Sequence, residues 1–107
     1  MHVVVDNSAG GDPFFAGEVA EGLRARGLEV ELREPLQAKE FDTFVHVVSA
    51  GLVIRVSEHP DRAVLAVIAE VVRGALMHRP SVRRRARSVP VHLGETGRAI
   101  EWIDVFD

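Results

Sequence analysis

The stretch HVVVDNSAGGDP, residues 2–13, decides the fold because it joins a strand, a glycine loop and a helix start. His2–Val5 is a short run rich in β-branched residues, which predicts a first strand. Gly10 and Gly11 are typical of a loop with unusual backbone dihedrals. Asp12-Pro13 then predicts a helix start, since aspartate accepts hydrogen bonds from free helix amides and proline suits the first helical position. This succession of elements is typical of an α/β protein.

The residues that follow complete a strand–helix–strand unit. Apolar residues recur at spacings of three and four as far as Leu23, which predicts a helix with one apolar stripe. Gly27 is typical of the position just past a helix end. Leu28–Arg33 alternates apolar and charged residues, which predicts a strand with one solvated face. We expect the two strands to be parallel and to be joined by a right-handed crossover.

The middle of the chain contains a strongly apolar strand and an apolar helix. Thr43–Val48 is almost continuously apolar, which favours a central place in the sheet. Leu52–Val56 reads as a further strand, either in a hairpin that turns at Gly51 or as one continuous strand kinked there. A second helix is predicted from Pro60 to about Met77. Because it is apolar around most of its circumference, it belongs in the core or in a subunit interface.

The last two predicted strands are Val89–Leu93 and Arg98–Phe106, joined by a loop with Gly94 and Gly97 at its ends. The elements therefore follow the order β-α-β-β-(β)-α-β-β. We predict one α/β domain over residues 1–107, a two- or three-layer sandwich with a mixed sheet of five or six strands and two helices.

The amino-acid composition excludes several classes of function. A hydrophobic fraction of 47% and a charged fraction of 27% are typical of a folded domain. The absence of cysteine excludes disulfides, thiolate catalysis and cysteine-ligated metals. The N-terminus lacks the features of a secretory signal, and the longest apolar run, Ala63–Ala69, is far shorter than the roughly 20 residues of a membrane span. We expect a cytoplasmic protein that does not enter a membrane.

The charge is unevenly distributed along the chain. Acidic residues concentrate in residues 1–61 and basic residues in residues 62–107. Such a distribution permits association with a charged partner or with a second copy, and the alternative is that the asymmetry cancels in the folded domain. One basic run is a possible contact surface, with a solvated linker as the alternative; it comprises Arg79, Arg83, Arg84, Arg85 and Arg87. No aromatic residue interleaves this run and the pI is about 5.9, so we do not expect nucleic acid as the partner.

The loop after the first strand is the best candidate ligand site. α/β proteins often bind anions at a glycine-bearing loop that opens a helix. A second Ser-Ala-Gly sequence at 49–51 would reach the same sheet edge if the strand before it were parallel to the first. The candidate residues are Asp6, Ser8, Gly10, Gly11, Asp12, Ser49 and Gly51. In the alternative interpretation, Asp12 only caps the helix and the glycines only form the turn.

The two carboxylates of this loop also have a catalytic interpretation. An acid at the end of a first strand can hold Mg²⁺ in phosphoryl-transfer enzymes, and Asp12 or Asp42 could assist Asp6. No suitably placed basic residue follows, and the chain has no nucleophile motif of the GxSxG type. We therefore predict no catalytic residues and no metal.

Residues 3–33 resemble the opening of a flavodoxin-like protein. The resemblance lies in the order of strand, small-residue loop, helix and strand, with the helix motif Ala-Glu-Gly-Leu-Arg-Ala-Arg-Gly at Ala20–Gly27. It implies a phosphate-binding loop at the first helix. Only Ser8 matches the Ser/Thr-rich flavin-phosphate loop of that family, so we predict no bound cofactor.

A second resemblance covers more of the chain. The apolar second helix, the arginine-rich connector His78–Arg87 and the final glycine-flanked hairpin resemble the effector-associated constant component domains of bacterial conflict systems. That resemblance implies an adaptor rather than an enzyme. We therefore predict a non-catalytic protein-interaction domain that binds a protein partner or a second copy of itself. The alternative is a domain that binds a small molecule or an anion, of nucleotide or flavin type, at the loop after strand one.

Overall fold

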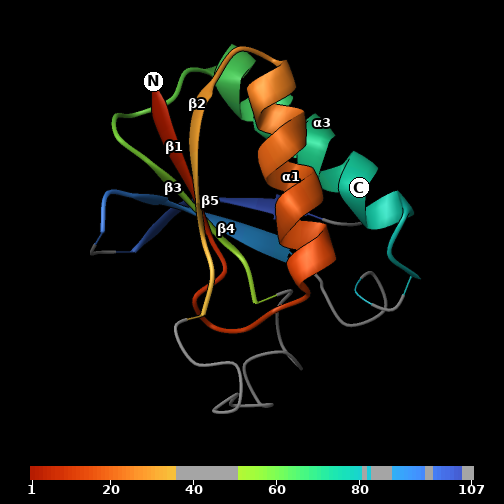
Figure 1. The fold of residues 1–107 in the computed structure, drawn as a ribbon. Helices are drawn as coiled ribbons and strands as arrows, with labels where there is room; N and C mark the ends of the chain where they lie inside the picture. Colours follow the sequence, from red (N-terminus) through yellow and green to blue (C-terminus); the bar gives the residue numbers. More distant parts are fainter. Residues whose placement is uncertain (36–50, 81, 83–87, 96–97, 105–107) are drawn as a thin grey trace.

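The computed structural model describes residues 1–35, 51–80, 82, 88–95 and 98–104 and confirms an α/β fold (Figure 1). The predicted strand Thr43–Val48 lies outside the described residues, and so does Ser49. The choice between a hairpin and a kinked strand at Gly51 depends on that segment. Asp42 and four arginines of the predicted basic surface, at positions 83, 84, 85 and 87, also lie outside the described residues.

In the described part of the chain, the sheet is mixed and has five strands in the order β2-β1-β3-β4-β5. The elements are β1 (His2–Asp6), α1 (Pro13–Ala25), β2 (Glu29–Arg33), β3 (Val53–Val56), α3 (Arg62–Met77), β4 (Ser88–Leu93) and β5 (Ala99–Asp104). β1 is parallel to β2, as predicted, and antiparallel to β3. β3 is parallel to β4, which is antiparallel to β5. Among the described strands, β2 and β5 therefore form the edges of the sheet.

The two helices that the structure describes both begin at an aspartate cap. The Asp12 carboxylate accepts hydrogen bonds from the amides of Phe14 and Phe15, at 2.8 and 3.1 Å, and α1 begins at the next residue as predicted. The carboxylate of Asp61 accepts from the amide of Val64 at 2.9 Å. Because Asp61 is the cap, α3 begins at Arg62 and not at the predicted Pro60.

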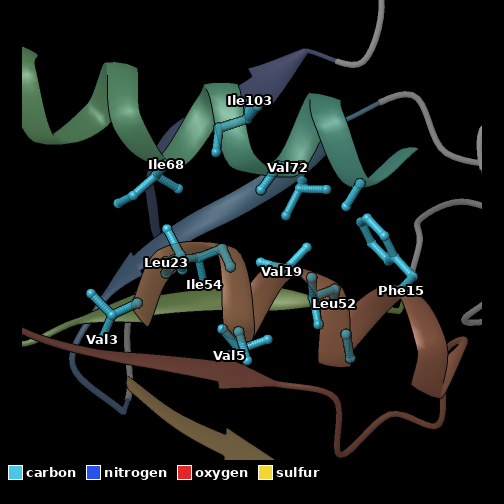
Figure 2. Packing of buried hydrophobic residues seen from close by; sticks show 14 of the residues in the cluster. Val3, Val5, Phe15, Val19, Leu23, Leu52, Ile54, Ile68, Val72 and Ile103 are labelled. Atoms are coloured by element: carbon cyan, nitrogen blue, oxygen red, sulfur yellow. The ribbon is translucent and has the colours of Figure 1, made fainter. Parts of the chain in front are cut away.

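The core lies between the sheet and the two helices, which cover the same face of the sheet (Figures 1 and 2). Alternate strand residues point into it, and α1 and α3 each add one apolar stripe. Its fully buried members include Val3, Val5, Ile54, Phe15, Val19, Leu23, Ile68 and Val72. The helices approach closely at Gly22, where an added Cβ would lie only 2.7 Å from Val71 Cγ1. The described residues therefore form a two-layer sandwich, in which one stripe of α3 belongs to the core.

The connector after α3 is not fully solvated. Val82 is only 2% exposed and belongs to the buried core cluster. The solvated-linker interpretation therefore does not hold at this residue. In the part of the chain that the structure describes, no helix combines the length and the apolar character needed to cross a membrane.

Candidate functional site

The structure brings Gly51 against the loop after β1. A Cβ added to Gly51 would lie 2.8 Å from Gly11 Cα, so the two backbones are in contact. The expected route, through a strand Thr43–Val48 parallel to the first, lies outside the described residues. Because β3 is antiparallel to β1, Val53 pairs with Asp6, and the residues that precede β3 reach the carboxyl end of β1.

Replacing Gly51 by alanine is expected to lower the free energy of unfolding by about 1–3 kcal/mol. Gly51 has φ +73°, where side chains are strained, and its Cβ would overlap the Gly11 backbone. The matched control is Gly74→Ala in α3, where an added Cβ meets no atom within 4 Å and a gain of about 0.5–1 kcal/mol is expected. Urea denaturation measures both. A Gly51→Ala variant as stable as the wild type would contradict the described contact.

Asp6 is a buried, hydrogen-bonded carboxylate. Its Oδ1 accepts from the Ser8 amide at 3.0 Å and from Ser8 Oγ at 2.5 Å, and its Oδ2 accepts from Arg55 Nε at 2.8 Å. Burial acts to raise the pKa of Asp6, but the hydrogen bonds from Ser8 and Arg55 outweigh it and hold the pKa below its ordinary value of 3.8. Asp6 is therefore an ionised anchor for its neighbours.

The helix end beside this loop already has its hydrogen-bond partners. Asp12 accepts from the amides of Phe14 and Phe15, which are the groups an anion would use. The Asn7 side chain donates to the Gly11 carbonyl at 3.1 Å, and this bond fixes the loop from inside. The capping interpretation of Asp12 therefore describes the observed geometry, with Gly10 at φ +83° in the turn.

Sequence reasoning missed a charge network beside Asp6. Arg33 Nη1 and Nη2 donate to the two carboxylate oxygens of Glu95 at 2.6 and 2.7 Å, and Arg33 Nε donates to Glu31 at 2.8 Å. Arg55 Nη1 donates to the carbonyls of Gly94 and Glu95, both at 3.3 Å. The hydrogen bonds between Arg33 and Glu95 lower the pKa of the Glu95 carboxyl and raise that of Arg33. One sequence signal was available, because Arg55 is the only charged residue in the apolar run 52–56.

A groove lies between α3 and the edge strand β5. Its volume is about 290 Å³, and its lining includes Arg62, Leu65, Ala66, Ala69, Glu101 and Ile103. Trp102 also borders the groove and is 56% exposed, which is unusual for the largest apolar side chain. The floor of the groove is therefore apolar, and its rim is charged.

Side chains of the same chain bind two backbone groups of β5. The Trp102 amide donates to Glu101 Oε1 at 3.2 Å. The residue of β4 that pairs with Trp102 is Pro90, which has no backbone N–H to donate to Trp102. The Asp104 carbonyl accepts from Arg73 Nε at 2.9 Å. Natural proteins often protect a sheet edge with charged side chains in this way.

Arg79 is the one arginine of the predicted basic surface that the structure describes. Its guanidinium lies 5.4 Å from the centroid of the Phe14 ring, and its Nη2 lies 3.6 Å from Glu18 Oε1. Arg79 therefore joins the end of α3 to the start of α1, so its role in the described structure includes packing within the chain.

Neither the described side chains nor the comparisons assign an activity. Within residues 1–35, 51–80, 82, 88–95 and 98–104, no three His, Asp or Glu side chains are grouped so that they could hold a metal ion. No family model, curated protein or solved structure matches the chain.

Proposed function

We propose that this protein is a non-catalytic protein-interaction domain that accepts an extended segment of a partner beside β5. The observation that carries the proposal is the edge of β5, where Glu101 and Arg73 occupy backbone groups next to an apolar groove. The resemblance to adaptor domains of bacterial conflict systems supports the same class of function. We propose the adaptor role on both grounds.

Strand addition fits the bonds that the edge makes. An added strand binds through main-chain hydrogen bonds and places alternate side chains on one face. A partner carbonyl would take the place of the Glu101 carboxylate at the Trp102 amide, and a partner amide would take the place of Arg73 at the Asp104 carbonyl. Each exchange replaces one hydrogen bond by another, so these two backbone groups are satisfied both before and after binding.

The face of α3 beside β5 defines the chemistry of the partner. Arg62, Ala66, Ala69 and Arg73 follow one stripe of the helix, with arginines at the ends and alanines between. The stripe is about 16 Å long, which is about the length of a five-residue strand. The alanines leave room for an aliphatic side chain, and the arginines favour acidic side chains at either end. The proposed partner is therefore an extended acidic–aliphatic–acidic segment.

Selection of a random ten-residue phage-displayed library on the whole chain tests this proposal. Enriched peptides are expected to carry an aliphatic residue flanked by acidic residues and to shift the emission of Trp102, the single tryptophan. Ala66→Glu places bulk and negative charge in the groove, so it is expected to weaken their binding by about tenfold or more.

Ala63→Glu is the matched control, since Ala63 is exposed on the same helix but lines a different groove with Arg26 and Leu28. Peptides that bind the Ala63→Glu and Ala66→Glu variants equally well would exclude the α3–β5 groove. A library that yields no enriched peptide would argue against strand addition altogether.

A further inference from the structure

We infer that Arg33 and Arg55 form a binding site for an oxyanion, a carboxylate or a phosphate group, and that Glu95 occupies this site from within the chain. The site is distinct from the α3–β5 groove. Arg55 lies between Ile54 and Val56, which both face the core, so its side chain projects from the opposite face of the sheet. The inference therefore goes beyond the proposed strand-binding function and does not depend on it.

The contact between Arg33 and Glu95 has the geometry of ligand recognition. Two parallel N–H···O bonds, at 2.6 and 2.7 Å, join the ends of one guanidinium to both oxygens of one carboxylate. This two-pronged arrangement is how arginine recognises planar carboxylates and phosphates. Arg55 lies beside it and donates to the Glu95 backbone carbonyl. Two guanidinium groups thus converge on the segment that carries the Glu95 carboxylate.

Acidic side chains other than Glu95 hold the two arginines of the site in place. Asp6 Oδ2 lies 2.8 Å from Arg55 Nε and 3.9 Å from Arg33 Nη1, and the Asp6 side chain is only 7% exposed. Glu31 binds Arg33 through Nε, which leaves both Nη atoms for Glu95. Because buried or neighbouring acids fix both arginines, the site does not depend on Glu95 for its arrangement.

Glu95 is the exchangeable member of the cluster. The side chains of Arg33 and Arg55 are already balanced by Asp6 and Glu31, so Glu95 is the one carboxylate in excess. Its side chain is 61% exposed, and it lies at the tip of the β4–β5 hairpin rather than in a strand. An exposed ion pair is weak because water competes for both partners. An external carboxylate can therefore replace Glu95 without a change in the charge of the site, and a phosphate group adds at most about one further negative charge.

Titration of the whole ¹⁵N-labelled chain with inorganic phosphate and, separately, with acetate tests this site at constant ionic strength. The signals to follow are the side-chain Nε–H groups of Arg33 and Arg55. Glu95→Ala is expected to bind at least one of the two anions about tenfold more tightly than the wild type, because the internal competitor is gone. The anion with the larger gain identifies the class of ligand.

Two further variants make the result decisive. Glu95→Ala combined with Arg33→Gln is expected to lose the gain, since the two-pronged donor is gone. Glu21→Ala breaks another exposed pair, Glu21–Arg24 at 2.6 Å on α1, and is expected to bind as weakly as the wild type. No gain for Glu95→Ala, a gain that survives Arg33→Gln, or an equal gain for Glu21→Ala would overturn the inference.

Discussion

Replacing Phe15 by alanine is expected to lower the free energy of unfolding by about 3–5 kcal/mol. Phe15 is completely buried and belongs to the core cluster (Figure 2). The alanine variant would lose the free energy gained by burying the ring. It would also leave a cavity, because the closely packed neighbours cannot move enough to fill it. A domain of this size is typically stable by only about 5–15 kcal/mol, so the variant is expected to be close to unfolding.

Phe14→Ala is the matched control for this prediction, because it removes the same ring one residue earlier. Phe14 is 70% exposed, and its ring contacts the Arg79 guanidinium. Losing that contact is expected to cost less than about 1 kcal/mol. Urea denaturation of both variants gives the comparison. Similar losses for the two variants would show that α1 does not present Phe15 to the core.

Replacing Asp6 by alanine is expected to cost about 2–4 kcal/mol. The change removes the acceptor for Ser8 and leaves the half-buried Arg55 guanidinium without its closest carboxylate. The control is Glu31→Ala, which breaks an ion pair between exposed oxygens and Arg33 and is expected to cost at most about 1 kcal/mol. Equal losses in the two variants would mean that Asp6 does not anchor the network.

The effect of Asp6→Ala is also expected to depend on pH. The folded state holds the pKa of Asp6 below the ordinary value of 3.8, so the unfolded chain takes up the proton first as the pH falls. The stabilisation by Asp6 is therefore complete above that value and is lost as the pH falls through the folded-state pKa. Denaturation curves should converge for wild type and variant in acid. A difference that stays constant down to pH 2 would contradict the lowered pKa.

The elements could be predicted where their signals are local. The sequence Asp12-Pro13 marked the start of α1 and Gly27 its end, because caps act within one helical turn. The direction of β3 could not be predicted in the same way. Its pairing with β1 joins residues about fifty positions apart, and spacing within a short window carries no information about such a partner.

The candidate site was predicted only in part for the same reason. The loop after β1 was singled out by its glycines and acids, and the structure does place Gly51 against it. The partners of Asp6 were missed, because Arg55 lies 49 residues away. Glu95 lies 62 residues from Arg33, in a loop that the sequence shows only as a turn. Ion pairs of this kind become visible only when the strand order is known.

The strand order also separates the sheet into two groups of strands that come from different parts of the chain. Strands β2 and β1 come from residues 1–35, and β3, β4 and β5 come from residues 51–104. Among the described elements, the most extensive contacts between the two groups are the β1–β3 ladder and the crossing of α1 and α3. Within each group, the strands contact one another through residues that are closer together in the sequence, and such contacts form quickly. The β1–β3 ladder and the helix crossing at Gly22 join residues about fifty positions apart, so closing the chain between them carries a larger entropic cost than the contacts within each group.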